Sequence, residues 1–214
     1  MTEVTAFGDV VGGVVLVAGC YLLGSLPFSV WIARAYGVDV RKVGSGNPGA
    51  TNVLRAAGRG PGVLALLCDA GKGVLAVVLA RLLTDSPAWW CWAALAAVCG
   101  HVFSVFLRFQ GGKGVATAAG ALVAVSPSAL SVALVVFVAA VAATRYVSLG
   151  SILAAVAFPI ALWFLTAREL TTGPRVGLMV SSSLIALIVL ARHRANLQRL
   201  LTGTENKLGG TRTA

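Results

Sequence analysis

The residues best suited to chemistry lie in a polar segment between two long apolar runs, GSGNPGATNVLR at residues 44–55. Gly44, Gly46 and Gly49 can take positive φ, so the chain can fold tightly over a ligand. Arg55 offers a permanent planar cation. The small side chains that can hydrogen-bond here without bulk are Ser45, Asn47, Thr51 and Asn52. This combination predicts a site for an oxyanion, most simply a phosphate, although it also suits a surface turn before a helix.

A second candidate is the glycine-rich turn GGKG at residues 111–114. Gly111, Gly112 and Gly114 would leave backbone N–H groups open around the charge of Lys113. A helix starting after this turn would direct its positive N-terminal end to the same place. The turn is not a Walker motif, because Gly114 stands where that motif needs Ser or Thr. It predicts either a nest for a small phosphate or a tight turn that carries a lysine.

The third candidate is HRANLQRLLTGTENK at residues 193–207. His193 and Asn196 are three residues apart, so a helix would place them on one face at the membrane edge. A histidine there can act as a base, an acid or a phosphate donor. The alternative is a solvated basic helix with no chemical role. We expect Glu205 to be structural, pairing with a nearby arginine or capping backbone N–H groups.

Two charged residues, Asp69 and Lys72, interrupt an apolar run. At a spacing of three residues on a helix they can pair with each other. Charges at that depth are costly and usually face the interior of a bundle. The main expectation is therefore a structural ion pair near the site, with direct substrate contact as the alternative.

Other familiar sites do not fit these residues. Residues 44–49 match GxGxxG, but that fingerprint needs a preceding strand, and an apolar span precedes it here. An intramembrane serine hydrolase would place its serine on a helix in a buried dyad, whereas Ser45 lies in a polar loop beside arginines. The four cysteines lie in apolar runs without metal-ligand spacing, so they predict neither a disulfide nor a zinc site.

The elements that position these motifs are membrane helices. The chain is 58% apolar and 11% charged, whereas roughly a quarter of the residues of a soluble domain are charged. Apolar runs separated by short polar segments predict helices at residues 10–33, 62–83, 88–107, 115–125, 129–144, 151–166 and 175–191, with a hinge at 145–150. The fourth of these, 115–125, is too short to cross a ~30 Å hydrocarbon core upright. We predict an all-α, polytopic membrane bundle of about seven helices, some half-spanning, forming one domain over residues 1–214.

The net charge of +10 is distributed unevenly between the two sides of this topology. The side that bears the N-terminus holds only Arg81, Arg168 and Arg175. Apart from Lys72, which lies within an apolar run, the other lysines and arginines fall on the side of the C-terminal tail. The positive-inside rule then places the N-terminus outside and the C-terminus in the cytoplasm. All three motifs fall on the cytoplasmic side. The charge is thus mostly a topology signal and does not indicate a nucleic-acid partner.

The three motifs together resemble the bacterial membrane glycerol-3-phosphate acyltransferases that use acyl phosphate as donor. The matching stretches are GSGNPGATNVLR, then GH..FSVFL.F.GGKGVAT, then HR.N..RLL.GTENK, in that order. The stretches at residues 69–73 and 148–151 also look like the family, and the likeness covers about residues 15–208. Ser104 stands where proline is common and Gln110 where lysine is common, so one charge near the glycine-rich turn is missing here.

The resemblance implies acyl transfer from acyl phosphate to the primary, sn-1 hydroxyl of glycerol 3-phosphate. The products would be lysophosphatidic acid and inorganic phosphate, in the first step of phospholipid synthesis. It implies no metal, no cofactor and no acyl-CoA or acyl-carrier-protein donor. It places the protein in the bacterial inner membrane with a site that faces the cytoplasm, and we expect a monomer.

The residue types suit that reaction. Both substrates carry phosphate, which basic and amide-rich loops can hold, and the mixed-anhydride donor is already activated. We expect Ser45, Lys113 and the glycine N–H groups to hold the acyl phosphate. Arg55, His193 and Asn196 would hold glycerol 3-phosphate, and either His193 or a substrate phosphate oxygen would take the hydroxyl proton. The further residues expected to bind phosphate or shape the loops are Thr51 and Asn52, with Ser148 and Ser151 implied by the resemblance.

Two other classes of protein remain as alternatives. A small anion carrier would also present glycine loops and basic residues, but we find neither an inverted repeat nor polar motifs toward both faces. A membrane-surface scaffold with a basic tail would leave the glycine motifs unexplained.

Overall fold

The computed structural model describes residues 2–166 and 172–209, and within these residues every regular element is a helix. Six helices are long and apolar enough to cross a membrane, and the short apolar helix Val115–Val125 accompanies them. The predicted all-α membrane fold is therefore confirmed. The chain divides into two compact units, Met1–Val125 and Ser126–Ala214, which we describe separately. The single domain over residues 1–214 and the orientation of the termini stay predictions.

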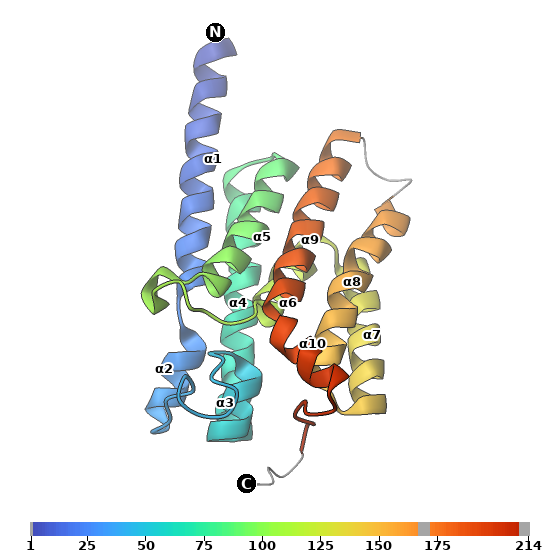
Figure 1. Cartoon of the computed structure of the whole chain (residues 1–214). Coiled ribbons are helices and arrows are strands. Elements are labelled where there is room, and N and C mark those ends of the chain that lie inside the picture. The colour runs from blue at the N-terminus through green and yellow to red at the C-terminus, as the bar shows by residue number, and fades with distance from the viewer. Residues whose placement is uncertain (1, 167–171, 210–214) are drawn as a thin grey trace. The chain divides into compact units, whose positions relative to one another are not determined.

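The first unit opens with a broken helix, because α1 (Thr2–Ser25) ends just before Pro27 and α2 (Phe28–Ala35) begins after it (Figure 1). Proline has no N–H to continue a helical ladder, so carbonyl groups at the end of α1 lose their partners. Side chains from elsewhere replace them: the Ser104 hydroxyl donates to Ser25 O, and Lys72 Nζ donates to Leu26 O at 2.8 Å. The prediction of one uninterrupted helix over residues 10–33 is wrong at this point.

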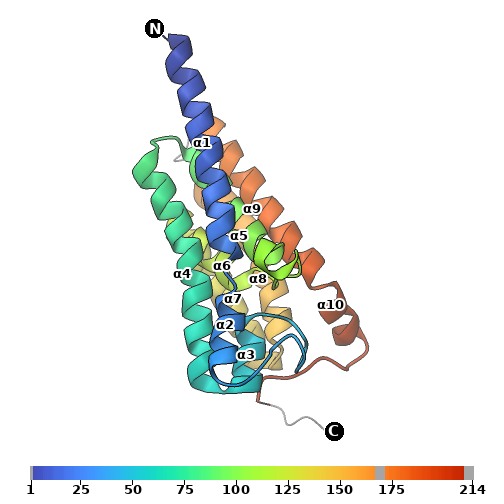
Figure 2. The ribbon, with the colours of Figure 1, turned by 90° about the vertical axis from the view of Figure 1, so that its left-hand side faces the viewer.

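The polar loop that follows α2 leads into α3 (Ala50–Ala57) and the long α4 (Arg59–Leu83). Both α2 and α3 pack beside the beginning of α4 (Figures 1 and 2). Gly58, with φ +96°, forms the corner between α3 and α4. Gly62 then lets α4 approach α3 closely, because a Cβ there would stand 2.6 Å from the Cα of Leu54. The first motif is thus held at the beginning of α4.

The remaining elements of the first unit are α5 (Pro87–Val102), the short 3-10 helix η1 (Val105–Leu107) and α6 (Val115–Val125). Glycines allow the backbones of these helices to touch. A methyl group on Gly73 of α4 would collide with the α6 backbone at Thr117, and one on Gly120 of α6 with the α4 backbone at Ala70. Close packing through small residues is typical of membrane helices. It fixes α6 against α4, and with it the turn that carries Lys113.

The second unit contains α7 (Pro127–Thr144), α8 (Val147–Thr166), α9 (Thr172–Arg192) and α10 (Arg194–Leu201). Helices α7 and α8 pack along each other, and α9 packs on α8. The predicted hinge at residues 145–150 is shorter than expected, because α8 already begins at Val147 and includes Ser148. Arg168, one of the three cations predicted on the side of the N-terminus, lies outside the described residues.

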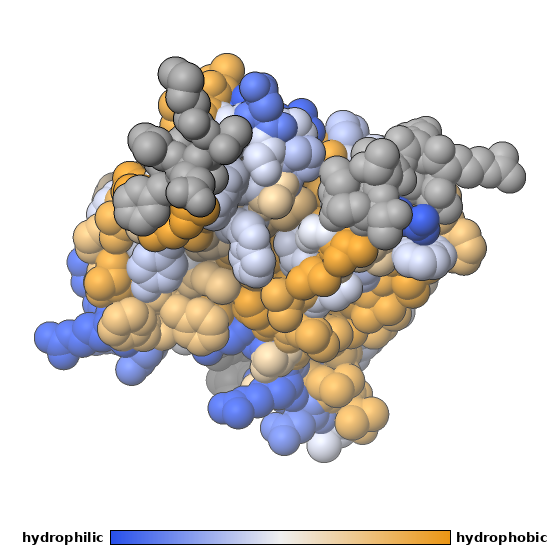
Figure 3. All heavy atoms as spheres, turned by 90° about the horizontal axis from the view of Figure 1, so that it is seen from above, coloured by the Kyte–Doolittle hydropathy of each residue, from blue (hydrophilic) through white to orange (hydrophobic). Residues whose placement is uncertain are grey.

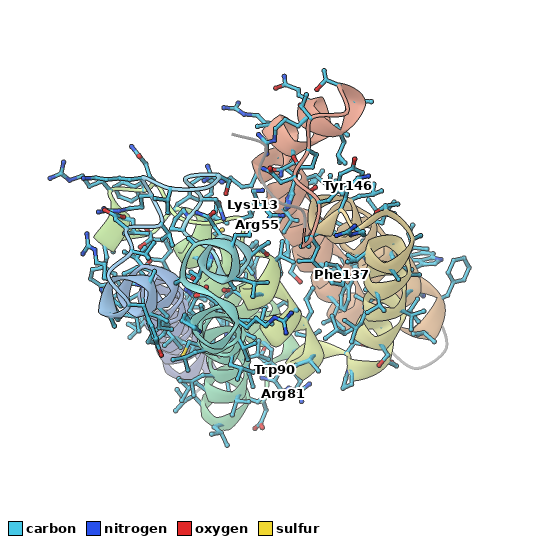
Figure 4. All side chains as sticks on the ribbon, turned by 90° about the horizontal axis from the view of Figure 1, so that it is seen from below. Arg55, Arg81, Trp90, Lys113, Phe137 and Tyr146 are labelled. Carbon is cyan, nitrogen blue, oxygen red and sulfur yellow. The ribbon has the colours of Figure 1, made fainter. Side chains whose placement is uncertain are left out.

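Apolar side chains are exposed along the long helices, as contact with lipid requires (Figure 3). Three tryptophans, Trp89, Trp90 and Trp92, lie at the start of α5. In the structure the Arg81 guanidinium stands over the ring of Trp90 at 4.8 Å, and Trp90 Nε1 donates to Thr84 O at 2.9 Å (Figure 4). An amphipathic ring with one polar partner suits such an interface.

Candidate active site

The loop of the first motif is shaped by glycines in left-handed conformations. Gly44 has φ +64° and Gly46 φ +68°, so two of the three expected positive-φ positions are confirmed. Gly49 instead has φ −145°, which is extended backbone, because it is the residue that precedes α3. The expectation of positive φ at Gly49 is therefore wrong. Its N–H donates to Asn47 O at 2.9 Å, which turns the chain into the helix.

Asn52 holds this loop together from the first turn of α3. Its Nδ2 donates to Val40 O at 2.8 Å and to Val43 O at 3.0 Å, and its Oδ1 accepts from Ser45 N at 3.1 Å. The residue is 2% exposed. Of the two roles considered for Asn52, the structure shows the loop-shaping one. A methyl group at Gly44 would collide with Asn52 Oδ1, so glycine is required there.

The side chains of the first motif that face outward are Ser45 and Arg55, both of which are exposed. Arg55 lies in the last turn of α3, and Thr51, which is half-buried, lies in the first turn. The carboxylate nearest in sequence, Asp39, forms a two-pronged pair with Arg41 at 2.7 and 2.9 Å. The hydrogen bonds from Arg41 hold the pKa of Asp39 well below its ordinary value. Asp39 is thus an ionised carboxylate already held by an arginine.

The GGKG turn lies against the end of α5. Gly111 N donates to Val102 O at 3.0 Å, and Gly112 N donates to His101 O at 3.1 Å. The prediction that these two N–H groups are open is wrong, since both serve to fix the turn. Gly114 has φ +81° and immediately precedes α6. The turn therefore presents the half-buried Lys113 at the N-terminal end of α6, where the helix dipole is positive.

The first two motifs meet at Gly112. A Cβ on this glycine would collide with the ring of His101 and stand 3.0 Å from Pro48 O, so only glycine fits between them. A cavity of about 10 Å³, room for about one water molecule, lies beneath this contact and is lined in part by Pro48, Gly112 and His101. Arg55 and Lys113 project close together in the view from below (Figure 4). The segments that carry Arg55 and Lys113, distant from each other in the chain, thus meet within the first unit.

The ion pair of Asp69 and Lys72 is confirmed, with Nζ 3.0 Å from Oδ1 and both side chains 2% exposed. Asp69 Oδ2 accepts from Ser29 Oγ at 2.6 Å, near the N-terminus of α2. Lys72 Nζ donates to Leu26 O at the C-terminal end of α1. Each charge therefore faces the helix end of opposite polarity, so the pair joins the two halves of the broken helix. The pair thus has a structural function in the fold, and its relation to the substrate stays a prediction.

His101, which belongs to the second matching stretch but for which no role was predicted, lies between Asp69 and the GGKG turn. Its Nδ1 lies 3.1 Å from Thr117 Oγ1 and 3.6 Å from Asp69 Oδ1. The sequence signal that could have found it is the Gly-His pair at the end of an apolar helix, eleven residues before Gly112.

The third motif lies in the second unit, where Glu205 gathers its side chains. Oε1 of Glu205 accepts from Asn196 Nδ2 at 2.8 Å and from Ser148 Oγ at 3.0 Å, and Oε2 accepts from Arg199 Nε at 2.7 Å. The predicted pairing of Glu205 with an arginine is confirmed. Burial alone would raise the pKa of Glu205, but these hydrogen bonds outweigh it and lower the pKa below its ordinary value.

His193 and Asn196 are both buried, so the solvated-helix alternative for this motif does not hold. His193 stands between α9 and α10, with Nδ1 2.8 Å from Val189 O. Ser151 donates to Val147 O at 2.8 Å within α8. The hydroxyl protons of Ser148 and Ser151 are therefore already used inside the second unit, and their roles in phosphate binding stay predictions.

The tail after α10 is fastened to the start of α8. Leu208 N donates to Arg145 O at 2.7 Å, and Arg145 Nη2 donates back to Leu208 O at 2.8 Å. Lys207 Nζ stands over the ring of Tyr146 at 5.5 Å. These contacts keep Glu205 beside Asn196. In the described part of the chain, no group of three or more His, Cys, Asp or Glu residues could hold a metal ion.

The family model, the relatives and the solved structures that this chain resembles all carry the same description. A family model described as glycerol-3-phosphate acyltransferase matches residues 14–203. A glycerol-3-phosphate acyltransferase of Trichlorobacter lovleyi is 48% identical over 195 residues, which cover 91% of this chain and 97% of that protein. A crystal structure of PlsY, an integral membrane glycerol 3-phosphate acyltransferase in its glycerol 3-phosphate form, is 42% identical with a TM-score of 0.81, covering 92% of this chain and 96% of that one. Its lysophosphatidic acid form is 41% identical with a TM-score of 0.79, covering 92% and 95%.

Proposed function

The chain belongs to the glycerol-3-phosphate acyltransferase family, and from this premise we propose that its acyl donor is acyl phosphate and its acceptor the sn-1 hydroxyl of glycerol 3-phosphate. The products are then lysophosphatidic acid and inorganic phosphate. Membership of an enzyme family makes the anion carrier and the scaffold unnecessary as explanations of the glycine motifs.

The observation that carries the proposal is the meeting of two phosphate-suited loops at Gly112 and Pro48. One loop brings Ser45 and Arg55, and the other brings Lys113 at the start of α6. Two phosphorylated substrates need two groups of cations and donors, because one cation cannot neutralise both phosphates. The first unit supplies two such cations, Arg55 in the last turn of α3 and Lys113 in the GGKG turn.

Two carboxylates lie in or beside the motifs, and both already accept hydrogen bonds from other side chains. Asp39 is paired with Arg41, and Glu205 accepts hydrogen bonds from Asn196, Arg199 and Ser148. A carboxylate held in this way is a weak general base. A mixed anhydride with a phosphate leaving group needs less base catalysis than an unactivated donor would, so positioning and charge stabilisation can do most of the work.

In the proposed reaction the hydroxyl oxygen of glycerol 3-phosphate attacks the acyl carbonyl carbon. A new ester C–O bond forms, the bond between that carbon and the phosphate oxygen breaks, and the phosphate leaves with the electron pair. The hydroxyl proton passes either to His193 or to an oxygen of the leaving phosphate. Lys113 and Ser45 hold the acyl phosphate, and Arg55, His193 and Asn196 hold and orient glycerol 3-phosphate. The site faces the cytoplasm of a bacterial inner membrane, and the protein works as a monomer.

The donor is tested with purified protein in detergent, palmitoyl phosphate and radiolabelled glycerol 3-phosphate. We expect equal amounts of labelled lysophosphatidic acid and inorganic phosphate, and ³¹P NMR of the product should show the 1-acyl isomer. Palmitoyl-CoA in place of palmitoyl phosphate should give no product. Phosphate release without a lipid product would indicate hydrolysis, and equal use of palmitoyl-CoA would refute the proposed donor.

A further inference from the structure

The buried cluster behind the GGKG turn contains a histidine whose hydrogen-bond partners define its protonated nitrogen. Thr117 has one hydroxyl proton, which it donates to the backbone oxygen of Asp69 at 2.8 Å. Thr117 Oγ1 can therefore only accept from His101 Nδ1, 3.1 Å away. The carboxylate of Asp69, 3.6 Å from the same nitrogen, favours a proton there as well. In the neutral ring Nδ1 then carries the hydrogen, and Nε2 does not.

The partners of Nδ1 are themselves fixed. Asp69 is held by Lys72 and Ser29, and Thr117 lies on α6, whose backbone touches α4 at Gly73. Thr117 is fully buried and His101 is 7% exposed. The ring of His101 consequently has little freedom to rotate or to move away from α4 and α6.

The opposite edge of the ring, which bears Nε2, lies against Gly112. A methyl group at Gly112 would collide with Nε2, and the N–H of Gly112 donates to the backbone oxygen of His101 itself at 3.1 Å. His101 thus contacts this glycine through both its ring and its carbonyl. Lys113 is the next residue along the chain.

Resting on the proposed function, we propose that His101 is a positioning residue for acyl transfer. Its ring, fixed by Asp69 and Thr117, sets the location of Gly112 and so the location of the Lys113 ammonium group. His101 acts through the turn, because its ring lies against Gly112 and only 7% of the residue is exposed. A displacement of about 1 Å in a substrate-holding group can cost about a hundredfold in rate, so a small shift of this turn is enough to be measured.

The test compares two amide replacements of this residue. His101→Asn keeps a donor near the position of Nδ1 but leaves the Gly112 side empty, whereas His101→Gln fills the Gly112 side with an amide near the position of Nε2 and leaves no donor at Nδ1. We expect H101N to raise the KM for the substrate whose phosphate Lys113 holds about ten- to hundredfold, with little change in the KM for the other substrate. H101Q should recover a large part of this loss.

A purely structural histidine would behave differently. H101N would then yield less folded protein, while the molecules that remain folded would keep the KM of the wild type. Unchanged KM and kcat in both variants, measured on the folded fraction, would overturn the proposal. Transfer by the wild type in the same assay tests the proposed function separately, and an equal rise in both KM values would overturn the proposed action of His101 through Lys113.

A double-mutant cycle with Gly112→Ala tests the contact directly, whether or not one variant folds poorly. The added methyl should abolish most activity beside the histidine ring but cost little more beside the shorter asparagine in H101N/G112A. Gly71→Ala is the matched control, because nothing lies within 4 Å of a Cβ at that position. Effects of G112A and H101N that multiply independently would contradict the proposed contact.

Discussion

Removing the side chain of Asn52 should release the loop of the first motif without touching any substrate-binding group. Asn52 makes three hydrogen bonds, to Val40 O, to Val43 O and from Ser45 N, and it is 2% exposed. At about 1 kcal/mol net for each bond, Asn52→Ala should lower the free energy of unfolding by about 3 kcal/mol. The loss is large compared with the total stability of a typical domain, about 5–15 kcal/mol.

Asn52→Asp is the sharper variant because it has the same shape. Its carboxylate can still accept from Ser45 N, but it faces Val40 O and Val43 O without a donor, so it should destabilise the loop at least as much as alanine does. We expect kcat/KM to fall about ten- to hundredfold in both variants, since Ser45 and Arg55 lose their fixed places.

The assay combines equilibrium unfolding in mixed micelles with steady-state acyl transfer. Gln198→Ala, an exposed amide in α10, serves as control and should change neither quantity. The reasoning is refuted if N52A and N52D unfold like the wild type and keep its kcat/KM.

Three further changes test other contacts. Gly44→Ala should lower stability and activity more than Gly37→Ala, because both glycines have positive φ but only a methyl at Gly44 meets another side chain; equal effects in thermal unfolding would contradict this. The lowered pKa of Glu205 contributes stability that is present above the ordinary carboxyl pKa and is lost as pH falls through the lower folded value. As the pH is lowered, the melting temperature of the wild type should therefore fall more than that of Glu205→Gln. Parallel pH profiles of the two proteins would contradict this role of Glu205. Asp69→Asn leaves Lys72 as an unpaired buried charge and should lower the free energy of unfolding by about 3–5 kcal/mol. The double variant Asp69→Asn/Lys72→Met removes that charge and should regain a large part of the loss. No recovery in unfolding experiments would show that the ion pair is not the cause.

Features that depend on neighbours in sequence could be predicted. The short helix Val115–Val125 has the predicted bounds, because an apolar run there ends at Ser126-Pro127. Asp69 and Lys72 pair as expected, since three residues of helix bring their side chains together. Glu205 pairs with Arg199 across a six-residue turn.

Features that depend on distant residues could not be predicted. The apolar run at residues 10–33 continues through Pro27, so hydropathy does not show the break, and the groups that stabilise it come from Lys72 and Ser104. The N–H groups of Gly111 and Gly112 are used by the end of α5, which their own sequence does not indicate. His101 was missed for the same reason, because Asp69 lies 32 residues before it in the chain.

The central claim is that the first motif and the GGKG turn hold different phosphates, which equilibrium binding can test. The dissociation constants of glycerol 3-phosphate and of a non-hydrolysable acyl phosphonate would be measured for wild type, Arg55→Ala and Lys113→Ala. A hydrogen bond to a charged group contributes about 1.5–3 kcal/mol, which corresponds to roughly a ten- to hundredfold change in affinity. We predict that R55A weakens only glycerol 3-phosphate and K113A only the phosphonate; equal weakening of one ligand by both variants, or of neither ligand by either, would contradict the account.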